Sequence, residues 1–301
     1  MSSVEQGDDM EVCASCGKAA VDDVKLKKCA CNLVKYCSVD CQKNHRPQHK
    51  KACKKRLAEI REDKLFRQPD ESYLGECPLC CLPLSVDHDK SVNSTCCSKR
   101  ICIGCDYANQ KREREQGLEK RCAFCREPLP TTDEEIEQND MKRVKVNDPA
   151  ALCNVGKKSY LEGDYEGAFQ YFTKAAELLE IEAHYQLAML YRNGAGVEKN
   201  KKKEMHHLEE AAIGGHPEAR YNLGAYEMMN GRFKRGVKHF IIAANLGDDD
   251  ALEEVKKEFA RGVATKEDYE AALRGHQATV DATKSQKRTE GEAFFANNVG
   301  N

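Results

Sequence analysis

The residues of this chain that could do chemistry are its cysteines, sixteen of seventeen of which lie before residue 126. Zinc takes four thiolate or imidazole ligands at tetrahedral corners, and closely spaced pairs supply two ligands at once. Two pairs with i,i+4 spacing can each share one face of a helix. Residues 13–53 hold four such pairs, which predict two zinc sites: Cys13–Cys16, Cys29–Cys31, Cys37–Cys41 and His49–Cys53.

The run Tyr36-Cys37-Ser38-x-x-Cys41-Gln42-Lys43, followed by Pro47-x-His49-Lys50-Lys51-x-Cys53, resembles a MYND zinc finger. Two features depart from the family. The second knuckle is Cys-x-Cys rather than Cys-x-x-Cys, and Arg46 replaces the usual tryptophan. The family holds short, proline-containing peptides. The resemblance implies two interleaved sites: Cys13, Cys16, Cys37 and Cys41 in one, and Cys29, Cys31, His49 and Cys53 in the other, with His45 as the alternative to Cys29.

A second group of cysteine pairs, between residues 77 and 125, resembles a RING finger. Lys99 stands where that family has a histidine, and an ammonium group cannot ligate zinc. The second site therefore uses both Cys96 and Cys97, keeps three protein ligands plus water, or is reorganised. Cys81 is expected to be a bystander. The resemblance implies one site at Cys77, Cys80, Cys102 and Cys105, and another at Cys97 (or Cys96), Cys122 and Cys125.

RING fingers hold a ubiquitin-conjugating enzyme in a reactive pose, and the residues that do so are matched here in part. Leu79 matches the apolar residue inside the first knuckle, and Arg126 follows the last cysteine. Ala123 replaces the usual proline, and the chain has no tryptophan. No general base stands beside a three-ligand zinc site, so we predict no catalytic residue. The module is either structural or a ligase.

The charge of the chain limits its partners. A formal net charge of −2 and a pI near 6.5 argue against binding to nucleic acid or to an anionic membrane. The basic run 45–56 lacks interleaved aromatic residues, so it does not favour nucleic-acid recognition. No apolar signal segment follows Met1, and the longest largely apolar run, 240–246, is too short to span a bilayer. Clustered thiols then predict an intracellular protein of the cytoplasm or nucleus.

A helical repeat begins after residue 150. Alanines recur at intervals of 32, 36 and 32 residues, each is followed by a turn glycine, and paired alanines come next. Each unit is thus predicted to be two helices joined by a glycine turn, with small residues where the helices cross. The stretch 183–214 resembles a Sel-one-like repeat, a relative of the tetratricopeptide repeat. The unit starts are Ala151, Ala183, Ala219 and Ala251, and the glycines are Gly163, Gly194, Gly231 and Gly262.

These observations predict a multidomain chain. Two small zinc-stabilised modules, irregular with few short strands and helices, would precede an all-α helical-repeat solenoid. We expect a zinc-binding scaffold for protein–protein interaction, and the alternative is a RING-type ubiquitin ligase whose repeats recruit the substrate. The expected parts are a disordered start (1–11), a MYND-type finger (12–54), a helical linker (55–76), a RING-like module (77–130), a linker helix (131–149), repeats (150–275) and a polar tail (276–301).

Overall fold

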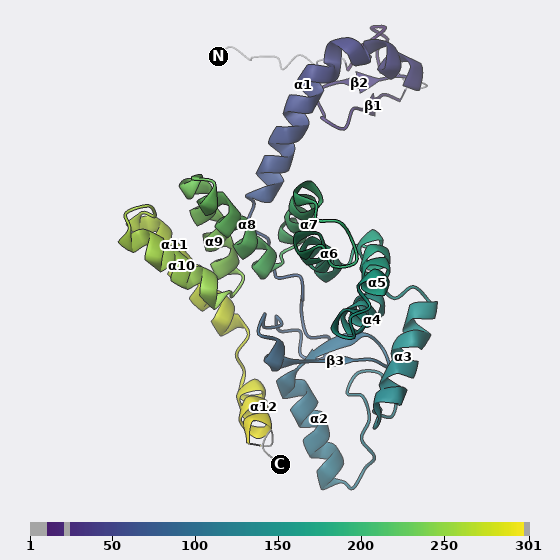
Figure 1. Cartoon of the computed structure of the whole chain (residues 1–301), viewed down its shortest axis with the longest axis vertical. Helices are drawn as coiled ribbons and strands as arrows, with labels where there is room; N and C mark the ends of the chain where they lie inside the picture. Colours follow the sequence, from purple (N-terminus) through teal and green to yellow (C-terminus); the bar gives the residue numbers. More distant parts are fainter. Residues whose placement is uncertain (1–10, 21–24, 298–301) are drawn as a thin grey trace, which may run out of the picture. The chain divides into compact units, whose positions relative to one another are not determined.

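The structure, a computed structural model, describes residues 11–20 and 25–297 (Figure 1). The chain divides into two compact units, Met1–Arg67 and Gln68–Asn301, which are described separately. The disorder predicted for residues 1–11 falls almost wholly on residues 1–10, which lie outside the described part. No helix of the described residues is long and apolar enough to cross a membrane.

The first unit combines a small hairpin with one long helix. β1 (Lys27–Lys28) pairs antiparallel with β2 (Lys35–Tyr36), and α1 (Val39–Leu65) follows. Ser38 caps α1 by accepting a hydrogen bond from the backbone N–H of Cys41 at 3.1 Å, which satisfies one of the free donors of the first turn. The helix contains Pro47 and continues to Leu65. The last part of the finger, from Val39 to Cys53, and the helix predicted after Cys53 therefore form the single helix α1.

The second unit opens with a hairpin and a helix that belong to the second cysteine-rich part. Strands β3 and β4 pair antiparallel, from Ser91 opposite Cys102 to Ser94 opposite Lys99. Ser98 takes a left-handed φ of 55° in the turn between them. The elements of this part are η1 (His88–Lys90), β3 (Ser91–Ser94), β4 (Lys99–Cys102) and α2 (Ile103–Glu115), followed by α3 (Asp133–Lys145).

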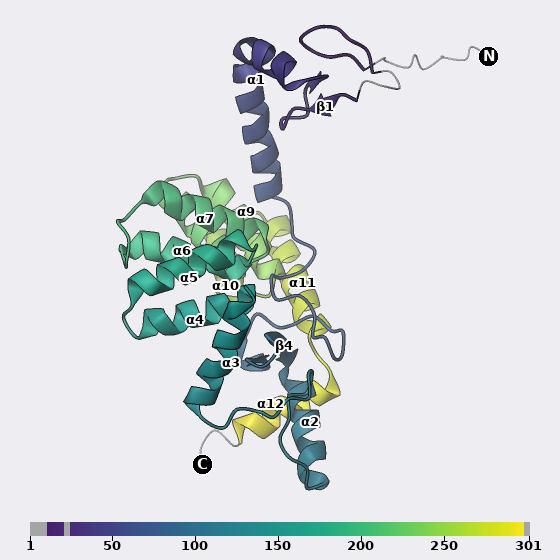
Figure 2. The ribbon, with the colours of Figure 1, turned by 90° about the vertical axis from the view of Figure 1, so that its right-hand side faces the viewer.

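Eight helices form the repeat array, stacked as four antiparallel pairs (Figures 1 and 2). Each pair turns on a predicted glycine, and all four glycines have positive φ, between 71° and 84°. The predicted solenoid is therefore confirmed. Its helices are α4 (Pro149–Leu161), α5 (Tyr165–Glu177), α6 (Ile181–Asn193), α7 (Lys201–Ile213), α8 (Pro217–Met229), α9 (Phe233–Asn245), α10 (Asp249–Ala260) and α11 (Lys266–Ala282).

Small residues let the helices of the array approach closely. Three of the four predicted alanine pairs are buried, and in the fourth only Ala272 is buried. Phe172 of α5 packs so tightly over Gly156 of α4 that an added Cβ would lie 2.7 Å from the ring. The same contact recurs between Phe240 and Gly224. None of these core residues is a candidate metal ligand, so the array has a core that does not depend on metal.

The segment expected to be a polar tail is helical in the structure. α11 continues to Ala282, and α12 (Gln286–Ala296) follows and packs along α2. Figure 1 shows α12, in yellow, beside α2. Gly104 and Gly291 permit this approach, because a Cβ on Gly104 would lie 2.6 Å from the backbone nitrogen of Arg288. The chain thus returns from the end of the array to the second cysteine-rich part.

The guanidinium of Arg288 joins α12 to the loop after the first knuckle of this part. Arg288 is 5% exposed and donates to the carbonyl oxygens of Pro83 at 2.6 Å, Thr283 at 2.7 Å and Leu82 at 3.1 Å. It also lies 3.6 Å from the Sγ of Cys80. The polar composition of the tail hid this contact, since a buried arginine that satisfies carbonyl groups looks like a solvated residue in the sequence.

The linker predicted to be helical over residues 55–76 is helical only to Leu65. Residues 68–76 have no helix and lie against the array instead. Tyr73 donates its backbone N–H to the carbonyl oxygen of Gly215 at 3.2 Å, and Asn245 donates to the Gln68 side chain at 3.1 Å. Tertiary contacts therefore set the conformation of this segment, which local sequence preference does not reveal.

Candidate metal centres

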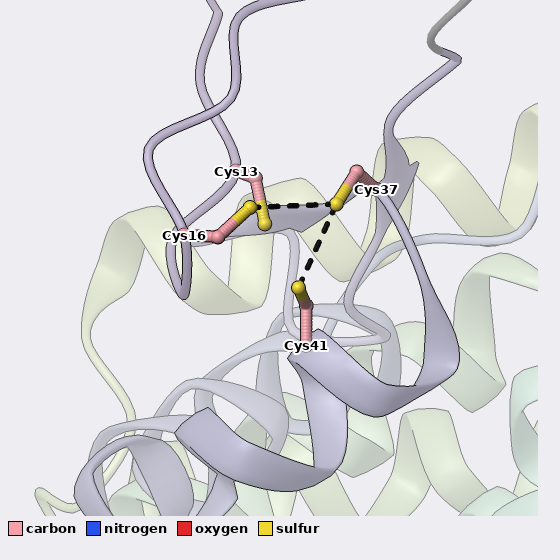
Figure 3. Close-up of side chains that lie close together, drawn as sticks. All are labelled: Cys13, Cys16, Cys37 and Cys41. Carbon is pink, nitrogen blue, oxygen red and sulfur yellow. Dashed lines mark hydrogen bonds between the residues drawn. The ribbon is translucent and has the colours of Figure 1, made fainter.

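The first group of candidate ligands joins a knuckle to the start of α1 (Figure 3). Cys13 and Cys16 lie on a turn, and Cys37 and Cys41 come from the end of the hairpin and the first turn of α1. The Sγ of Cys37 lies 3.6 Å from the Sγ of Cys16 and 3.6 Å from that of Cys41. All four ligand atoms lie within 4.8 Å of one another, so the two sequence pairs meet as the resemblance implies.

The second group joins the β1–β2 hairpin to the middle of α1. The Sγ of Cys29 lies 3.7 Å from that of Cys53, and the Sγ of Cys31 lies 3.1 Å from the Nε2 of His49. The shortened Cys-x-Cys knuckle therefore brings both thiols to the site. His45, the alternative ligand, is outside the group: its Nδ1 is 3.0 Å from the hydroxyl of Tyr36. Its ring is stacked on that of His49, with centroids 5.8 Å apart, so His45 packs against a candidate ligand rather than serving as one.

The third group lies between the loop after residue 76 and the start of α2. It contains Cys77, Cys80, Cys102 and Cys105, the set that the RING resemblance implies. The Sγ atoms of Cys80 and Cys102 are 3.7 Å apart, and the backbone N–H of Cys102 points at the Sγ of Cys77 at 3.4 Å. Cys77 and Cys102 are buried, so solvent has little access to this cluster.

The fourth group resolves the position where the sequence left three arrangements open. Both Cys96 and Cys97 lie in the β3–β4 turn and face Cys122 and Cys125. The Sγ distance is 3.3 Å from Cys96 to Cys125 and 3.9 Å from Cys97 to Cys122. Lys99 is exposed at the start of β4 and takes no place in the group. The fourth group therefore offers four thiols, enough for a tetrahedral site. In the sequence, the adjacent pair Cys96–Cys97 was the feature that pointed to this arrangement.

The spacing of the donor atoms fits zinc rather than disulfides. A tetrahedral site with Zn–S bonds of about 2.3 Å has S–S edges of about 3.8 Å. The shortest sulfur–sulfur distance in each of the four groups lies between 3.3 and 3.7 Å, whereas a disulfide requires about 2.05 Å. All cysteines of the described chain are free. Three groups offer four thiols, and the second offers three thiols and one imidazole. Structural zinc prefers ligand sets of these two kinds.

Backbone amides favour the thiolate form at the first cysteine of three knuckles. N–H groups of the turn, led by that of Cys16, lower the pKa of Cys13 to about 6. At Cys77 the side-chain hydrogen bond from the thiol of Cys102 is the largest cause, and with the backbone N–H groups of Cys102, Leu79 and Cys80 it lowers the pKa to about 4 against the effect of burial. At Cys122 burial opposes the shift, but the N–H of Cys125 helps to lower the pKa to about 7. Thiolates are the metal-binding form, so these turns prepare the ligands.

Two cysteines stand outside the four groups. Cys81, the predicted bystander, is exposed with a left-handed φ of 54°. Cys153 is buried in the core of α4, and burial raises the pKa of its thiol. A neutral buried thiol behaves as a small apolar side chain, so Cys153 is part of the repeat core.

The two candidate contacts for a conjugating enzyme are both at the surface. Leu79 is 42% exposed in the first knuckle. The Arg126 guanidinium donates to the Oδ1 of Asn109 at 2.7 Å and lies 3.5 Å from the Oε1 of Glu113, a residue that is 1% exposed. Arg126 thus ties the last knuckle to α2 and is only partly available to a partner.

A groove borders the second metal group on α1. It has a volume of about 590 Å³, and Tyr36, Val39 and Leu57 are among the residues that line it. Val39 and Leu57 are 60% and 40% exposed, which leaves apolar surface open to solvent. Four cations line the same groove: Lys43, Arg46, Lys50 and Lys54. The sequence identified the basic run but did not separate the residues that face this groove from those that face away.

Comparison with known families agrees with the two motifs found in the sequence. Residues 13–53 match the MYND finger, and residues 149–178, 181–216 and 217–248 match the Sel1 repeat. The pair α10–α11 adds a fourth helical pair after the matched repeats.

Relatives share short segments of this chain. HcpC of Helicobacter pylori (strain J99) is 48% identical over 56 residues, 19% of either chain. Protein SHC1 of Saccharomyces cerevisiae (strain YJM789) is 44% identical over 59 residues, 20% of this chain and 12% of SHC1. The crystal structure of a Sel1 repeat protein from Oxalobacter formigenes aligns with a TM-score of 0.43 at 24% identity, covering 59% of this chain and 74% of that one.

The matched segments span less than a fifth of the curated relatives, so their activities do not transfer to this chain. The motifs and the geometry support a coarser statement. The chain contains a MYND finger and stacked Sel1 repeats, domains typical of protein–protein interaction, with cysteine-rich groups suited to zinc.

Proposed function

We propose that this chain is a zinc-dependent interaction scaffold whose finger holds a short peptide from a partner protein. Each of the four ligand groups would hold one structural zinc ion. Structural zinc sites are closed by four protein ligands, and all four groups offer four. The free thiols of these groups suit a reducing compartment, the cytoplasm or the nucleus. The proposal includes no catalytic residue.

The observation that carries the proposal is the groove on α1. The exposed apolar side chains of Val39 and Leu57 in its lining suit small apolar residues of a peptide, such as proline. Its four cations suit acidic residues next to them in the peptide. Zinc fixes the groove, because Cys29, His49 and Cys53 belong both to its lining and to the second ligand group. A ligand is therefore expected to be a short, extended peptide in which apolar residues are flanked by carboxylates.

The test reverses one charge in the groove. Lys50→Glu is expected to weaken binding of a synthetic proline-containing acidic peptide about tenfold, or about 1.4 kcal/mol. Fluorescence anisotropy with the full zinc-loaded chain measures this. The matched control is Lys51→Glu, since Lys51 is exposed on α1 but does not line the groove. Equal losses in both variants would mean that general charge attraction, rather than this groove, captures the peptide.

A second candidate, a RING-like ubiquitin ligase in residues 77–130, is favoured by two exposed apolar side chains. Leu79 and Phe124 are 42% and 39% exposed, one in a knuckle of each of the third and fourth groups. The interleaving of those groups supports a RING-like arrangement. The partner would be a ubiquitin-conjugating enzyme, and the repeats would recruit its substrate.

Discharge of ubiquitin from a loaded conjugating enzyme tests the ligase directly. An active module should lose most of its activity on Leu79→Ala without losing zinc, because this side chain ligates nothing. Arg126→Ala should also lower discharge, and its zinc content separates a lost enzyme contact from loss of the Arg126 link to α2. No discharge by wild type with a broad panel of conjugating enzymes would exclude the ligase and leave the scaffold.

A further inference from the structure

The segment 68–76 crosses the repeat array along the turns that join successive helix pairs. It contacts Asn245 at the end of α9 through Gln68 and the α7–α8 turn through the backbone of Tyr73. Gly215 in that turn has a φ of 86°, and a Cβ there would lie 2.7 Å from the carbonyl oxygen of Glu71. The array therefore accommodates this segment at backbone distance. The segment itself forms a turn there, closed by a hydrogen bond from the N–H of Gly75 to the carbonyl oxygen of Ser72 at 3.0 Å.

Three aromatic rings define the centre of this contact. The ring of His216 is stacked with that of Tyr73, with centroids 4.4 Å apart and planes 10° apart. It is also stacked with Tyr185 of α6 at 4.4 Å and 27°. Two rings at this distance cannot share one face, so Tyr73 and Tyr185 cover opposite faces of the imidazole. His216 is 1% exposed, and the linker thus completes a socket that the array provides.

Carboxylates set the charge of the socket. The Nε2 of His216 lies 3.1 Å from Glu182, and its Nδ1 lies 3.0 Å from Glu218. Although burial lowers the pKa of His216, hydrogen bonds to Glu182 and Glu218 raise it overall. An aromatic ring stacks on the faces of the imidazole, which an aliphatic side chain cannot do. This socket therefore favours a tyrosine over an aliphatic side chain at the position of Tyr73.

Tyr73 also lines a cavity. This cavity has a volume of about 300 Å³ and is bordered by Tyr73, Glu182, Lys157, Arg100 and Lys99 among others. Lys157 forms an ion pair with Glu182 at 2.7 Å, and Lys99 is exposed at the start of β4. Glu180 also lines the cavity, so carboxylates and cations border it together. The stacked rings and the close backbone contact at Gly215, rather than net charge, therefore define what the socket holds.

We propose that residues 68–76 are an intramolecular ligand of the repeat array, and that the Tyr185–His216 socket binds a tyrosine presented on a turn of a partner's segment when Tyr73 leaves it. The inference rests on the proposed role of the array as a protein-binding surface and gives its partner a chemistry. A tethered ligand acts at an effective concentration near the millimolar range. The free segment of a partner must therefore outcompete Tyr73, and the chain restrains its own binding surface.

A synthetic peptide with the sequence of residues 68–76 tests this on the full, zinc-loaded chain. Tyr73→Ala is expected to bind the labelled peptide at least tenfold more tightly than wild type, because the socket is vacated. His216 is the N-cap of α8, where its side chain accepts a hydrogen bond from the backbone N–H of Ala219. The double variant Tyr73→Ala/His216→Asn should lose that gain, since asparagine can also cap a helix but has no ring to stack. Ser72→Ala, which keeps Tyr73, should resemble wild type. A peptide with alanine in place of tyrosine should not bind any of them.

A measurement on wild type keeps the test decisive if Tyr73→Ala does not fold. Millimolar peptide should speed hydrogen exchange of the Tyr73 backbone amide, which donates to Gly215, while the alanine peptide should not. No tighter binding by a folded Tyr73→Ala chain, a gain that survives His216→Asn, or unchanged exchange in wild type would each overturn the inference. Binding of the proline-containing peptide to the α1 groove is measured in parallel, and its loss alone would contradict only the proposed function of the finger.

Discussion

Chelation of zinc is expected to unfold the finger and to leave the repeat array helical. The buried core of the finger consists of Cys13, Cys29, Cys31 and Tyr36, so three of its four members are candidate ligands. Its two strands have two residues each, which cannot persist alone. Zinc supplies about 10–16 kcal/mol of apparent folding free energy in small zinc peptides. Without zinc, the finger has no other source of comparable stability.

The array should behave differently because its clusters contain no candidate ligand. Leu152, Phe172 and Leu187 pack in one cluster, and Phe240, Ala251 and Val255 in another. Circular dichroism with a strong chelator should therefore lose only the signal of α1 and the elements bound to the third and fourth groups. Limited proteolysis of the same sample should cut first within residues 12–67. Loss of all helical signal, or resistance of the finger to cleavage, would contradict this division.

Arg288→Leu is expected to release α12 from α2 and destabilise the second unit by about 3 kcal/mol or more. The substitution removes donors to carbonyl groups of the half-buried residues Pro83, Leu82 and Thr283. Each hydrogen bond to a charged group contributes about 1.5–3 kcal/mol, and carbonyls left buried without donors add a desolvation cost. Part of this cost is relieved when α12 detaches and water reaches the carbonyls.

Thermal unfolding and hydrogen exchange together measure the effect of Arg288→Leu. The amides of α12 should exchange faster, while those of α6 and α7 should keep their protection. Lys287→Ala is the matched control, because Lys287 is the exposed neighbour of Arg288 on the same helix. A midpoint that moves equally in both variants would show that the guanidinium of Arg288 contributes nothing specific.

The sequence predicted the finger and the array well because both depend on local spacing. The spacing of pairs such as Cys37–Cys41 brings two ligands together locally, and the structure groups the pairs as the MYND resemblance implied. The turn glycines and alanine pairs likewise set one helical pair at a time. Gly163 and Gly194 take the positive φ values that a turn requires, and Ala211 and Ala243 are fully buried. Such features need no knowledge of the rest of the chain.

What could not be predicted depends on contacts between distant residues. Lys99 suggested a defective site, but the tight β3–β4 turn brings Cys96 into the fourth group and leaves Lys99 outside it. Arg288 lies more than 200 positions from Pro83 in the sequence, so this contact could not be read from local pattern. The polar residues around Arg288 predicted only a polar tail. Tyr73 gave no signal in the segment predicted to be a helical linker, because its contacts are with the rings of Tyr185 in α6 and His216 at the start of α8. Periodicity cannot report pairings of this kind.

The claim on which the scaffold proposal rests is that all four groups hold zinc, and native mass spectrometry of the purified chain tests it directly. We expect four zinc ions per chain, four again in Lys99→Ala, and a lower count in Cys96→Ser, because Cys96 rather than Lys99 lies among the ligands. Two or fewer zinc ions in wild type, or full occupancy in Cys96→Ser together with zinc loss in Lys99→Ala, would contradict the account.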